Sequence, residues 1–448
     1  MDLEDVAQLA SDQGRYLLQK LPEYDPALAI KLVEGLRQRG INPKLAAAAL
    51  TQSRLRAGAR TKFGSFADSM IFTDQGLQQS TRLVVAAHHA QRYLAAGIER
   101  VTDLTGGIGG DALAIAALGL RVTVYERDPV TAACASFNLA AFPEAKVVCA
   151  NSLGIDLSHA EALFADPCRR DPQGQRRFDP AAYEPALDRL VALAAGYPLG
   201  LKVAPGIRHS AIPASAEAQW VSVDGDVVEA GLWFGPLRAA ADRTALIIRR
   251  ERAYHLAATG SERLPTGPLA DFIYEPDGAV IRASLLAEAA TTLGQPPGTS
   301  TGGAPPRGTS SVGTSSGSAS SPGASTPGAA APSVDYSLES RPGLSPALVS
   351  PRIAYITSGI EDARNPFLTG YRVIDTFDWG LKRLRGYLRE RGIGQVVVKK
   401  RGTAVDPAEL RKRLNLRGEA SAVVILTRLG LRQSVVVAEP LRAPKEAT

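Results

Sequence analysis

The sequence VTDLTGGIGGDALAIA at positions 101–116 decides the fold, because it joins a short strand to a helix through four glycines. Residues 100–105 suit a strand and residues 111–119 suit a helix, so the glycine loop lies at the carboxyl end of the strand. Open α/β sheets bind their ligands at this end of the strands. Glycine lets the backbone approach a ligand closely and adopt conformations that other residues avoid. The stretch therefore predicts the ligand-binding loop of an α/β sheet.

Strands and helices alternate from this loop onward. Strands are expected at 121–126, 146–152, 162–167 and 199–206, with helices at 129–142 and 183–196. Asp224-Gly225 between alternating apolar residues predicts a hairpin over 218–235, and 244–250 predicts one more strand. This order is typical of an α/β fold with a doubly wound, mostly parallel sheet and an antiparallel addition.

The composition along the chain predicts five segments. Apolar residues at helical spacing and the run PKLAAAAL at 43–50 predict helices before the sheet. A later stretch is mainly Gly, Pro, Ser, Thr and Ala with a single charge, Arg307, and is expected to be disordered. The segments are an N-terminal helical region (1–95), a ligand-binding domain (96–255), a connecting segment (256–293), a low-complexity insert (294–334) and a small α/β domain (335–445).

Overall composition excludes several classes of protein. Of the 448 residues, 45% are hydrophobic, which is enough for two or three domains with buried cores. Three cysteines are too few for a disulfide scaffold, and their spacing fits no zinc site, so no metal is expected. The N-terminus lacks the features of a signal peptide, and no apolar run is long enough to span a membrane. A cytoplasmic protein is therefore expected.

Positive charge is concentrated near the C-terminus. Between Gly380 and Arg432, fourteen Lys and Arg against four Asp and Glu give a net charge of +10, whereas the whole chain carries +6. This asymmetry is typical of an appended nucleic-acid-binding module, although a solvated arginine-rich face gives the same count. The candidate RNA contacts in this segment are Lys382, Arg385, Lys399, Lys400 and Arg401.

Two classes of cofactor compete for the glycine loop. Gly107, Gly109 and Ala112 satisfy the loose dinucleotide pattern G-x-G-x-x-[GA]. Asp103, however, precedes the glycines, where a carboxylate would repel a pyrophosphate but attract the sulfonium and ammonium groups of S-adenosylmethionine. Glu126 ends the second strand, nineteen residues after Gly107, and its carboxylate is expected to accept hydrogen bonds from the ribose. S-adenosylmethionine is therefore the expected cofactor.

Further cofactor contacts are expected on either side of these residues. Thr105 and Gly106 belong to the same loop. Asn151 and Ser152 follow the third strand, where this fold places a polar group beside the adenine, although Ala-Asn-Ser is also a good turn.

The segment ADPCRR at 165–170 ends the fourth strand with residues that support three chemistries. Asp166-Pro167 places a carboxylate at the edge of the site. Cys168 after a proline is typical of thiolates that attack carbon 6 of a pyrimidine, although a small, half-buried spacer is the simpler interpretation. Arg169 and Arg170 are suited to phosphate or a base edge, or to a local carboxylate.

Several motifs together resemble one bacterial family. They include MIFTDQGLQQST (70–81), DLTGGIGGD (103–111), ADPCRR (165–170), KVAPGI (202–207), FDWGLKRLR (377–385) and VVVKKRG (396–402). In these motifs the chain resembles class I S-adenosylmethionine-dependent methyltransferases that carry a C-terminal THUMP-like domain. The resemblance implies a Rossmann-like methyltransferase fold with a helical N-terminal region and a small α/β THUMP-like domain.

The resemblance also implies roles for particular residues. The methyltransferase half is similar to enzymes that methylate exocyclic amines of RNA bases, in which a segment before the glycine loop closes over the cofactor. Gln79 and Thr81 would play that part here. Asp166 and the carbonyl of Pro167 would accept hydrogen bonds from the target amine. The second proline and the aromatic residue of the related motif are absent, and Cys168 stands where the family has alanine.

The leading hypothesis is a methyltransferase that acts on a nucleobase of RNA held by the basic C-terminal domain. Asp166, Pro167 and Arg169 would form the catalytic edge, and Arg170 would contact the RNA. Two alternatives remain open from the sequence: a methyltransferase for a small metabolite, and a non-catalytic RNA-binding protein on the same fold. The oligomeric state does not follow from the sequence.

Overall fold

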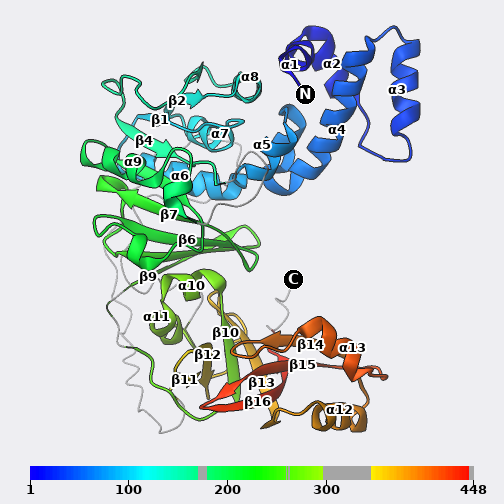
Figure 1. Cartoon of the computed structure of the whole chain (residues 1–448), viewed down its shortest axis with the longest axis vertical. Coiled ribbons are helices and arrows are strands. Elements are labelled where there is room, and N and C mark those ends of the chain that lie inside the picture. The colour runs from blue at the N-terminus through cyan, green and yellow to red at the C-terminus, as the bar shows by residue number, and fades with distance from the viewer. Residues whose placement is uncertain (170–178, 259, 261–262, 296–344, 443–448) are drawn as a thin grey trace, which may run out of the picture. The chain divides into compact units, whose positions relative to one another are not determined.

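The computed structural model describes residues 1–169, 179–258, 260, 263–295 and 345–442 (Figure 1). The described chain forms two compact units. The first comprises Met1–Gly260 and Asp277–Leu285, and the second comprises Ser261–Pro276, 286–295 and 345–442. Most of the predicted low-complexity insert, 294–334, and Arg170 lie outside the described residues. No helix within the described ranges is long and apolar enough to cross a membrane.

The first unit contains a nine-stranded sheet in the order β3-β2-β1-β4-β5-β7-β6-β8-β9. Its first five strands in that order run parallel, β7 is antiparallel to β5, and β6 and β7 form the predicted hairpin. The strands are β1 (Arg100–Asp103), β2 (Arg121–Glu126), β3 (Ala145–Cys149), β4 (Ala162–Ala165), β5 (Leu199–Val203), β6 (Glu217–Val223), β7 (Asp226–Phe234), β8 (Arg243–Arg249) and β9 (Arg252–Ala257). The predicted α/β fold with a mostly parallel sheet and an antiparallel addition is thus confirmed.

Helices precede the sheet and connect its strands, and one helix, α10, follows its last strand in the chain (Figure 1). They are α1 (Leu3–Ala10), α2 (Asp12–Lys20), α3 (Ala29–Gln38), α4 (Pro43–Phe63), α5 (Asp74–Gln79), α6 (Leu83–Ala95), α7 (Gly110–Ala117), α8 (Pro129–Asn138), α9 (Leu187–Ala192) and α10 (Gly278–Ala283). Buried side chains of α1, α4, α6 and α7 belong to the same apolar core as β1 and β2. The helical region and the sheet therefore share one core.

Several predicted elements are shorter in the structure: the helix expected over 129–142 ends at Asn138, and the strands expected over 146–152 and 199–206 end at Cys149 and Val203. The helix expected over 183–196 is wrong in its first residues, because α9 begins only at Leu187. Pro185 explains the difference, since a proline disfavours helical backbone at the preceding residue. The strand expected over 162–167 ends at Ala165, so Asp166 and Pro167 lie in the following loop.

The glycine loop turns sharply between β1 and α7. Gly107 (φ 53°) and Gly109 (φ 84°) have left-handed backbone conformations that favour glycine. A Cβ on Gly106 would lie 2.0 Å from a side-chain carbon of Val124, so that only glycine fits against β2. The loop is thereby held close to the ends of the central strands.

The second unit contains a seven-stranded sheet in the order β11-β12-β10-β13-β16-β15-β14. Helices α12 and α13 supply Leu384, Leu388, Leu410 and Leu414 to the apolar cluster on one of its faces. Segment 256–293, predicted to be a connection, contributes β10 to this sheet and α10 to the first unit. The elements are β10 (Phe272–Pro276), α11 (Leu286–Thr291), β11 (Ala347–Ser350), β12 (Ile353–Ser358), β13 (Leu368–Asp378), α12 (Leu381–Glu390), β14 (Ile393–Lys400), α13 (Pro407–Leu414), β15 (Ala420–Leu429) and β16 (Arg432–Pro440).

Candidate functional site

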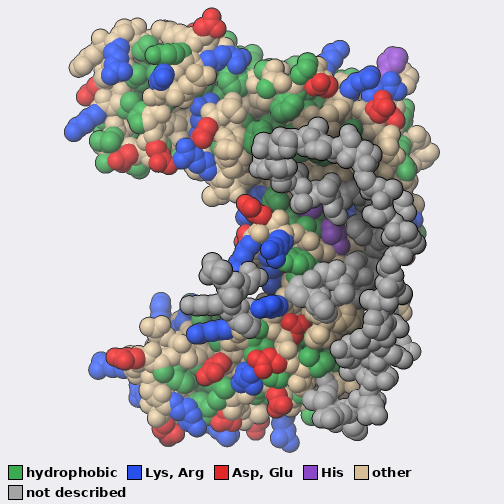
Figure 2. All heavy atoms as spheres, turned by 180° about the vertical axis from the view of Figure 1, so that it is seen from behind, with side chains coloured by type: hydrophobic (Ala, Val, Ile, Leu, Met, Phe, Trp, Pro, Cys, Tyr) green, Lys and Arg blue, Asp and Glu red, His purple; other side chains and the backbone are tan. Residues whose placement is uncertain are grey.

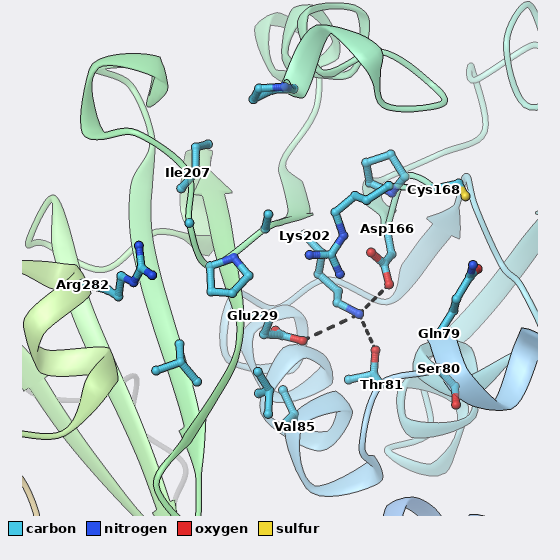
Figure 3. Close-up of a pocket in the computed structure, with 18 of the residues that line it drawn as sticks. Gln79, Ser80, Thr81, Val85, Asp166, Cys168, Lys202, Ile207, Glu229 and Arg282 are labelled. Carbon is cyan, nitrogen blue, oxygen red and sulfur yellow. Dashed lines mark hydrogen bonds and ion pairs between the residues drawn. The ribbon is translucent and has the colours of Figure 1, made fainter. Parts of the chain in front are cut away.

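A cavity of about 1120 Å³ opens in the first unit beside the carboxyl ends of β4 and β5 (Figure 3). Its wall combines the segment from α5 to α6, the loop after β4, the end of β5 with the following loop, and parts of β7 and α10. Open α/β sheets bind their ligands at this end of the strands. The cavity therefore lies where the glycine loop predicts the reaction site.

Asp103 at the end of β1 is buried below the glycine loop. Its Oδ1 accepts a hydrogen bond of 3.0 Å from the backbone N–H of Thr105. Burial, together with the nearby carboxylates of Asp111, Asp166 and Glu126, raises the pKa of Asp103 to about 8. A cationic group bound beside Asp103 would stabilise its ionised form, which fits a sulfonium cofactor.

Glu126 holds the loop from the end of β2. Its Oε2 accepts the N–H of Gly107 at 2.9 Å, and its Oε1 accepts the N–H of Asp128 at 2.8 Å. A Cβ built on Gly107 would meet no protein atom within 4 Å, so the loop faces open space at this point. The acidic group, the glycine backbone and the open space fit S-adenosylmethionine, which Asp103, Gly107 and Glu126 would hold.

The other predicted cofactor residues lie in different settings. Asn151 is exposed, and its Oδ1 accepts the N–H of Leu153 at 3.0 Å, as expected for a turn; Ser152 is half-buried beside it. Gln79, at the end of α5, is exposed and lines the cavity. Thr81 also lines the cavity, but its hydroxyl is engaged by buried charged groups.

Lys202 at the end of β5 is the centre of these charged groups. Its side chain is only 3% exposed. Its Nζ donates to Asp166 Oδ2 at 2.5 Å and to Thr81 Oγ1 at 2.5 Å, and lies 3.6 Å from Glu229 Oε2 and 3.8 Å from Asp111 Oδ2. Burial alone would lower the pKa of Lys202, but the three carboxylates outweigh burial and raise it. Lys202 therefore stays charged and cannot act as a base near neutral pH.

His89 of α6 lies between two of these carboxylates and contacts both of them. Its Nδ1 lies 2.9 Å from Asp111 Oδ1, and its Nε2 lies 2.6 Å from Glu229 Oε1. Both nitrogens face carboxylate oxygens, which only the doubly protonated imidazolium satisfies. Burial alone would lower the pKa of His89, but the charges of Glu229 and Asp111 raise it to about 9. We refer to Thr81, His89, Asp111, Asp166, Lys202 and Glu229 as the buried charge network.

Asp166 lines the cavity together with Thr81, Lys202 and Glu229 (Figure 3), and its side chain is the most exposed of the three carboxylates in the network. Its backbone N–H donates to Thr105 Oγ1 at 2.6 Å, and its Oδ2 accepts from Lys202. Within the described residues no hydrogen bond engages its Oδ1. One carboxylate oxygen is thus fixed by Lys202, and the other is available to a ligand.

Directly after Asp166, the loop that follows β4 contains the other residues of the predicted catalytic edge. Pro167 and Arg169 line the cavity. Cys168 also lines it, and its backbone pairs with that of Glu184 through hydrogen bonds of 2.9 and 3.1 Å. This backbone pairing fixes the path of the loop after β4, although the second proline of the related motif is absent.

Five residues of the site were not predicted from the sequence. Asp111 and Lys202 lie in motifs given above, but an isolated Lys, His, Asp or Glu has no pattern that indicates its partners. The contacts that join them span up to 140 positions, as between His89 and Glu229, so only the fold reveals them. They are Lys62, His89, Asp111, Lys202 and Glu229.

The predicted RNA contacts of the second unit differ in their surroundings: some are paired within the unit, and others are exposed. Lys399 and Arg401 both pair with Glu275 of β10, whereas Lys400 is exposed. Lys382 is exposed on α12, and Arg385 on the same helix donates to the backbone carbonyl of Arg413. Figure 2 shows acidic side chains among the basic ones on the visible face of this unit. The described positive charge is therefore partly neutralised locally.

Comparisons with known proteins agree with the cofactor that the sequence predicts. The family model described as "Putative SAM-dependent methyltransferase" matches residues 72–163, and the model described as "THUMP domain-like" matches residues 368–440. A third model, a domain of unknown function, matches residues 2–59. The first two matches cover the glycine loop and most of the second sheet.

Similar whole proteins agree as well. Uncharacterized S-adenosylmethionine-dependent methyltransferases from the CDC 1551 / Oshkosh and H37Rv strains of Mycobacterium tuberculosis are 29% identical over 384 residues, which is 84% of this chain and 91% of theirs. A solved structure described as a "putative methyltransferase from Porphyromonas gingivalis W83" aligns with a TM-score of 0.64 at 17% identity, over 94% of this chain and 100% of that one. At this identity the second likeness shows the fold alone.

The glycine loop, the acidic residues around it and these relatives define a class I methyltransferase that uses S-adenosylmethionine. Within that class, the match of residues 368–440 to the THUMP-like model makes the chain similar to methyltransferases with a C-terminal THUMP-like domain, as its motifs predicted.

Proposed function

We propose that this methyltransferase acts on an exocyclic amine of a nucleobase in RNA. The observation that carries the proposal is Asp166, which has one oxygen fixed by Lys202 and the other available at the cavity wall. A carboxylate oxygen held in this way can accept the N–H of an amine and so direct its lone pair. The THUMP-like domain supports RNA as the carrier of that amine.

The cofactor supplies an electrophilic methyl group on its sulfonium. Asp103, Gly107 and Glu126 would hold the cofactor at the end of β1 and β2. Asp166 Oδ1 would orient the acceptor nitrogen and take the proton that this nitrogen loses. Lys202 keeps the carboxylate of Asp166 in place, because its ammonium bonds the other oxygen. Catalysis on this scheme is mainly the positioning of two reactants.

The test is a methylation assay on RNA from a strain that lacks the protein. Purified enzyme and S-adenosylmethionine are incubated with this RNA, and nucleosides from the digested RNA are analysed by mass spectrometry. We expect one nucleoside to gain a methyl group on an exocyclic nitrogen, and Asp166→Ala to abolish the gain. A wild-type enzyme that binds S-adenosylmethionine but methylates no RNA would overturn the proposal.

A further inference from the structure

The cavity wall carries an excess of positive charge. Six Lys and Arg residues line it, against three acidic residues, Asp166, Asp179 and Glu229. Glu229 already pairs with His89 and Lys202. The six cationic residues are Lys62, Arg82, Arg169, Lys202, Arg208 and Arg282.

Four of these residues, all arginines, have no carboxylate partner in the part of the chain that the structure describes. Arg54, Arg60, Arg92 and Arg249 of the same unit each form an ion pair of 2.6–3.3 Å. No comparable pair to a described carboxylate exists for Arg82, Arg169, Arg208 and Arg282. Guanidinium groups that line a cavity without counter-ions favour an anionic ligand.

One group of cations lies beside α5 and α6. Arg82 precedes α6, and its carbonyl accepts the N–H of Val85 at 2.9 Å. The ammonium of Lys62 donates to the carbonyls of Leu77, Gln78 and Ser80 at 2.7–2.9 Å. Burial and the charges of Lys202 and Arg82 lower the pKa of Lys62 to about 8. Positive charges that destabilise one another in this way would be stabilised by a bound anion.

The second group lies across the cavity. His209 Nε2 lies 2.7 Å from the carbonyl oxygen of Arg282, which ties the loop after β5 to α10. The guanidinium of Arg282 lies close to Gly206, since a Cβ on that glycine would be 3.9 Å from Nη1. His209 also stacks on the ring of buried Trp220, with centroids 5.2 Å apart. Arg208 and Arg282 are thus carried by segments that are fixed to the sheet.

The segment that leads to Arg82 and the side chain of Arg282 lie on opposite sides of Asp166 and Lys202 in Figure 3. In Figure 3, Ile207 and Arg282 lie on one side of the cavity, and Gln79 and Ser80 lie on the other. Asp166 and Lys202 lie between them in that view. A nucleotide whose base reaches Asp166 would therefore have cations near the phosphates on both of its sides.

We infer that the cavity binds one nucleotide of an RNA strand with its base turned toward Asp166 and its two flanking phosphates held by Arg82 on one side and by Arg208 and Arg282 on the other. This inference rests on the proposed function and specifies its substrate as a base extruded from a strand, rather than a free nucleoside. Extrusion is the general means by which enzymes reach a reactive atom of a base. The cavity exceeds the roughly 300–1000 Å³ of usual ligand sites, which leaves room for the flanking phosphates.

The test compares Arg82→Gln and Arg282→Gln with Arg252→Gln as a matched control. Arg252 is an exposed arginine of β9 in the same unit and does not line the cavity. The KM for RNA and its dependence on salt are measured, together with calorimetric binding of S-adenosylmethionine and of inorganic tripolyphosphate. Arg82→Lys and Arg282→Lys keep the charge, and they serve where a glutamine variant fails to fold.

We expect each glutamine variant to raise the KM for RNA roughly tenfold, since a hydrogen bond to a charged group is worth about that factor. The slope of log KM against log salt should fall by about 0.7 for each lost phosphate contact. Binding of S-adenosylmethionine should remain unchanged. If Arg82→Gln and Arg282→Gln keep the KM and salt slope of Arg252→Gln while RNA is methylated, the inference is wrong and the proposed function stands. If no RNA is methylated but tripolyphosphate binds and both variants lose it, the anion site stands and the RNA substrate is refuted.

Discussion

Replacing Lys202 with Met should destabilise the first unit strongly. The methionine keeps the apolar stem but removes the ammonium that faces Asp111, Asp166 and Glu229. Breaking a buried ion pair by removing one partner costs about 3–5 kcal/mol. His89 still pairs with Asp111 and Glu229, and Asp166 is 20% exposed, so that water can solvate it. We therefore expect a loss near the lower end, about 3 kcal/mol in the free energy of unfolding at neutral pH.

The loss of stability in Lys202→Met should depend on pH. Burial alone would raise the pKa of Asp111, but Lys202 and His89 lower it to about 2 from the ordinary value of 3.8, and the pKa of Glu229 is also lowered. A carboxyl whose pKa is lower in the folded state contributes stability above its unfolded pKa, and this stability is lost as the pH falls toward the folded pKa. Without Lys202 these pKa values rise. The difference between wild type and variant should thus be largest near neutral pH and shrink below about pH 4.

The assay is urea unfolding at several pH values, followed by the fluorescence of the buried Trp220 and Trp233. Lys146→Met is the matched control, because Lys146 is exposed on β3 and forms no ion pair with a described residue. We expect Lys146→Met to unfold like the wild type. If Lys202→Met lies within about 1 kcal/mol of Lys146→Met at neutral pH, the ammonium does not stabilise the buried carboxylates and the reasoning is wrong.

Three further outcomes follow from the site. Asp103 has a pKa of about 8, and a cationic cofactor favours its ionised form, so the calorimetric affinity for S-adenosylmethionine should rise up to about 25-fold between about pH 6.5 and 8.5. Asp103→Asn should remove this pH dependence, and an unchanged dependence would contradict the assignment. Asp166→Ala should lower kcat for RNA about 100-fold or more with little change in cofactor affinity, whereas equal losses in both would indicate a cofactor role. Cys168→Ala should retain turnover, and its complete loss would favour a thiolate nucleophile.

Much of the fold follows from local sequence patterns. Alternating strands and helices, the glycine loop at 106–110 and the Asp224-Gly225 hairpin predict the sheet of the first unit, and each is present. Local patterns do not show which strand follows which in the sheet, and β7 lies between β5 and β6. They also do not show that β10 pairs with β12 and β13, because the partners are about 80 residues or more further along the chain. Long-range pairing is set by burial of the whole sheet, which no short window contains.

The residues of the site likewise divide into those that local sequence patterns predict and those that only the structure reveals. Asp103, Glu126 and Asp166 were predicted because each lies at the carboxyl end of a strand, and parallel strands bring these ends to one edge. The roles of these residues in cofactor and substrate binding stay predictions. Lys202 also ends a strand, but nothing in KVAPGI indicates that its ammonium turns inward toward Asp166. Charge partners in a buried network are determined by the packing of five separate segments, and only the assembled structure reveals which residues pair.

The buried charge network accounts for the departure of ADPCRR from the related motif. In that motif a second proline and an aromatic residue stiffen the edge and stack on the base. Here Thr105 and Lys202 fix Asp166 through its backbone and its side chain, so stiffness does not depend on the second proline. No aromatic side chain lies among the described residues that line the cavity, and so none of them can supply the stack.

Bases also stack on guanidinium planes, which this cavity has in excess. Arg169 follows the acceptor carboxylate by three positions and occupies the place where the related motif has its aromatic residue. An arginine there can offer a flat face to a base and a positive charge to its phosphate, which a phenyl ring cannot do. Replacing the aromatic residue with arginine thus exchanges apolar stacking for stacking combined with charge. This exchange suits a cavity whose other unpaired groups are also arginines.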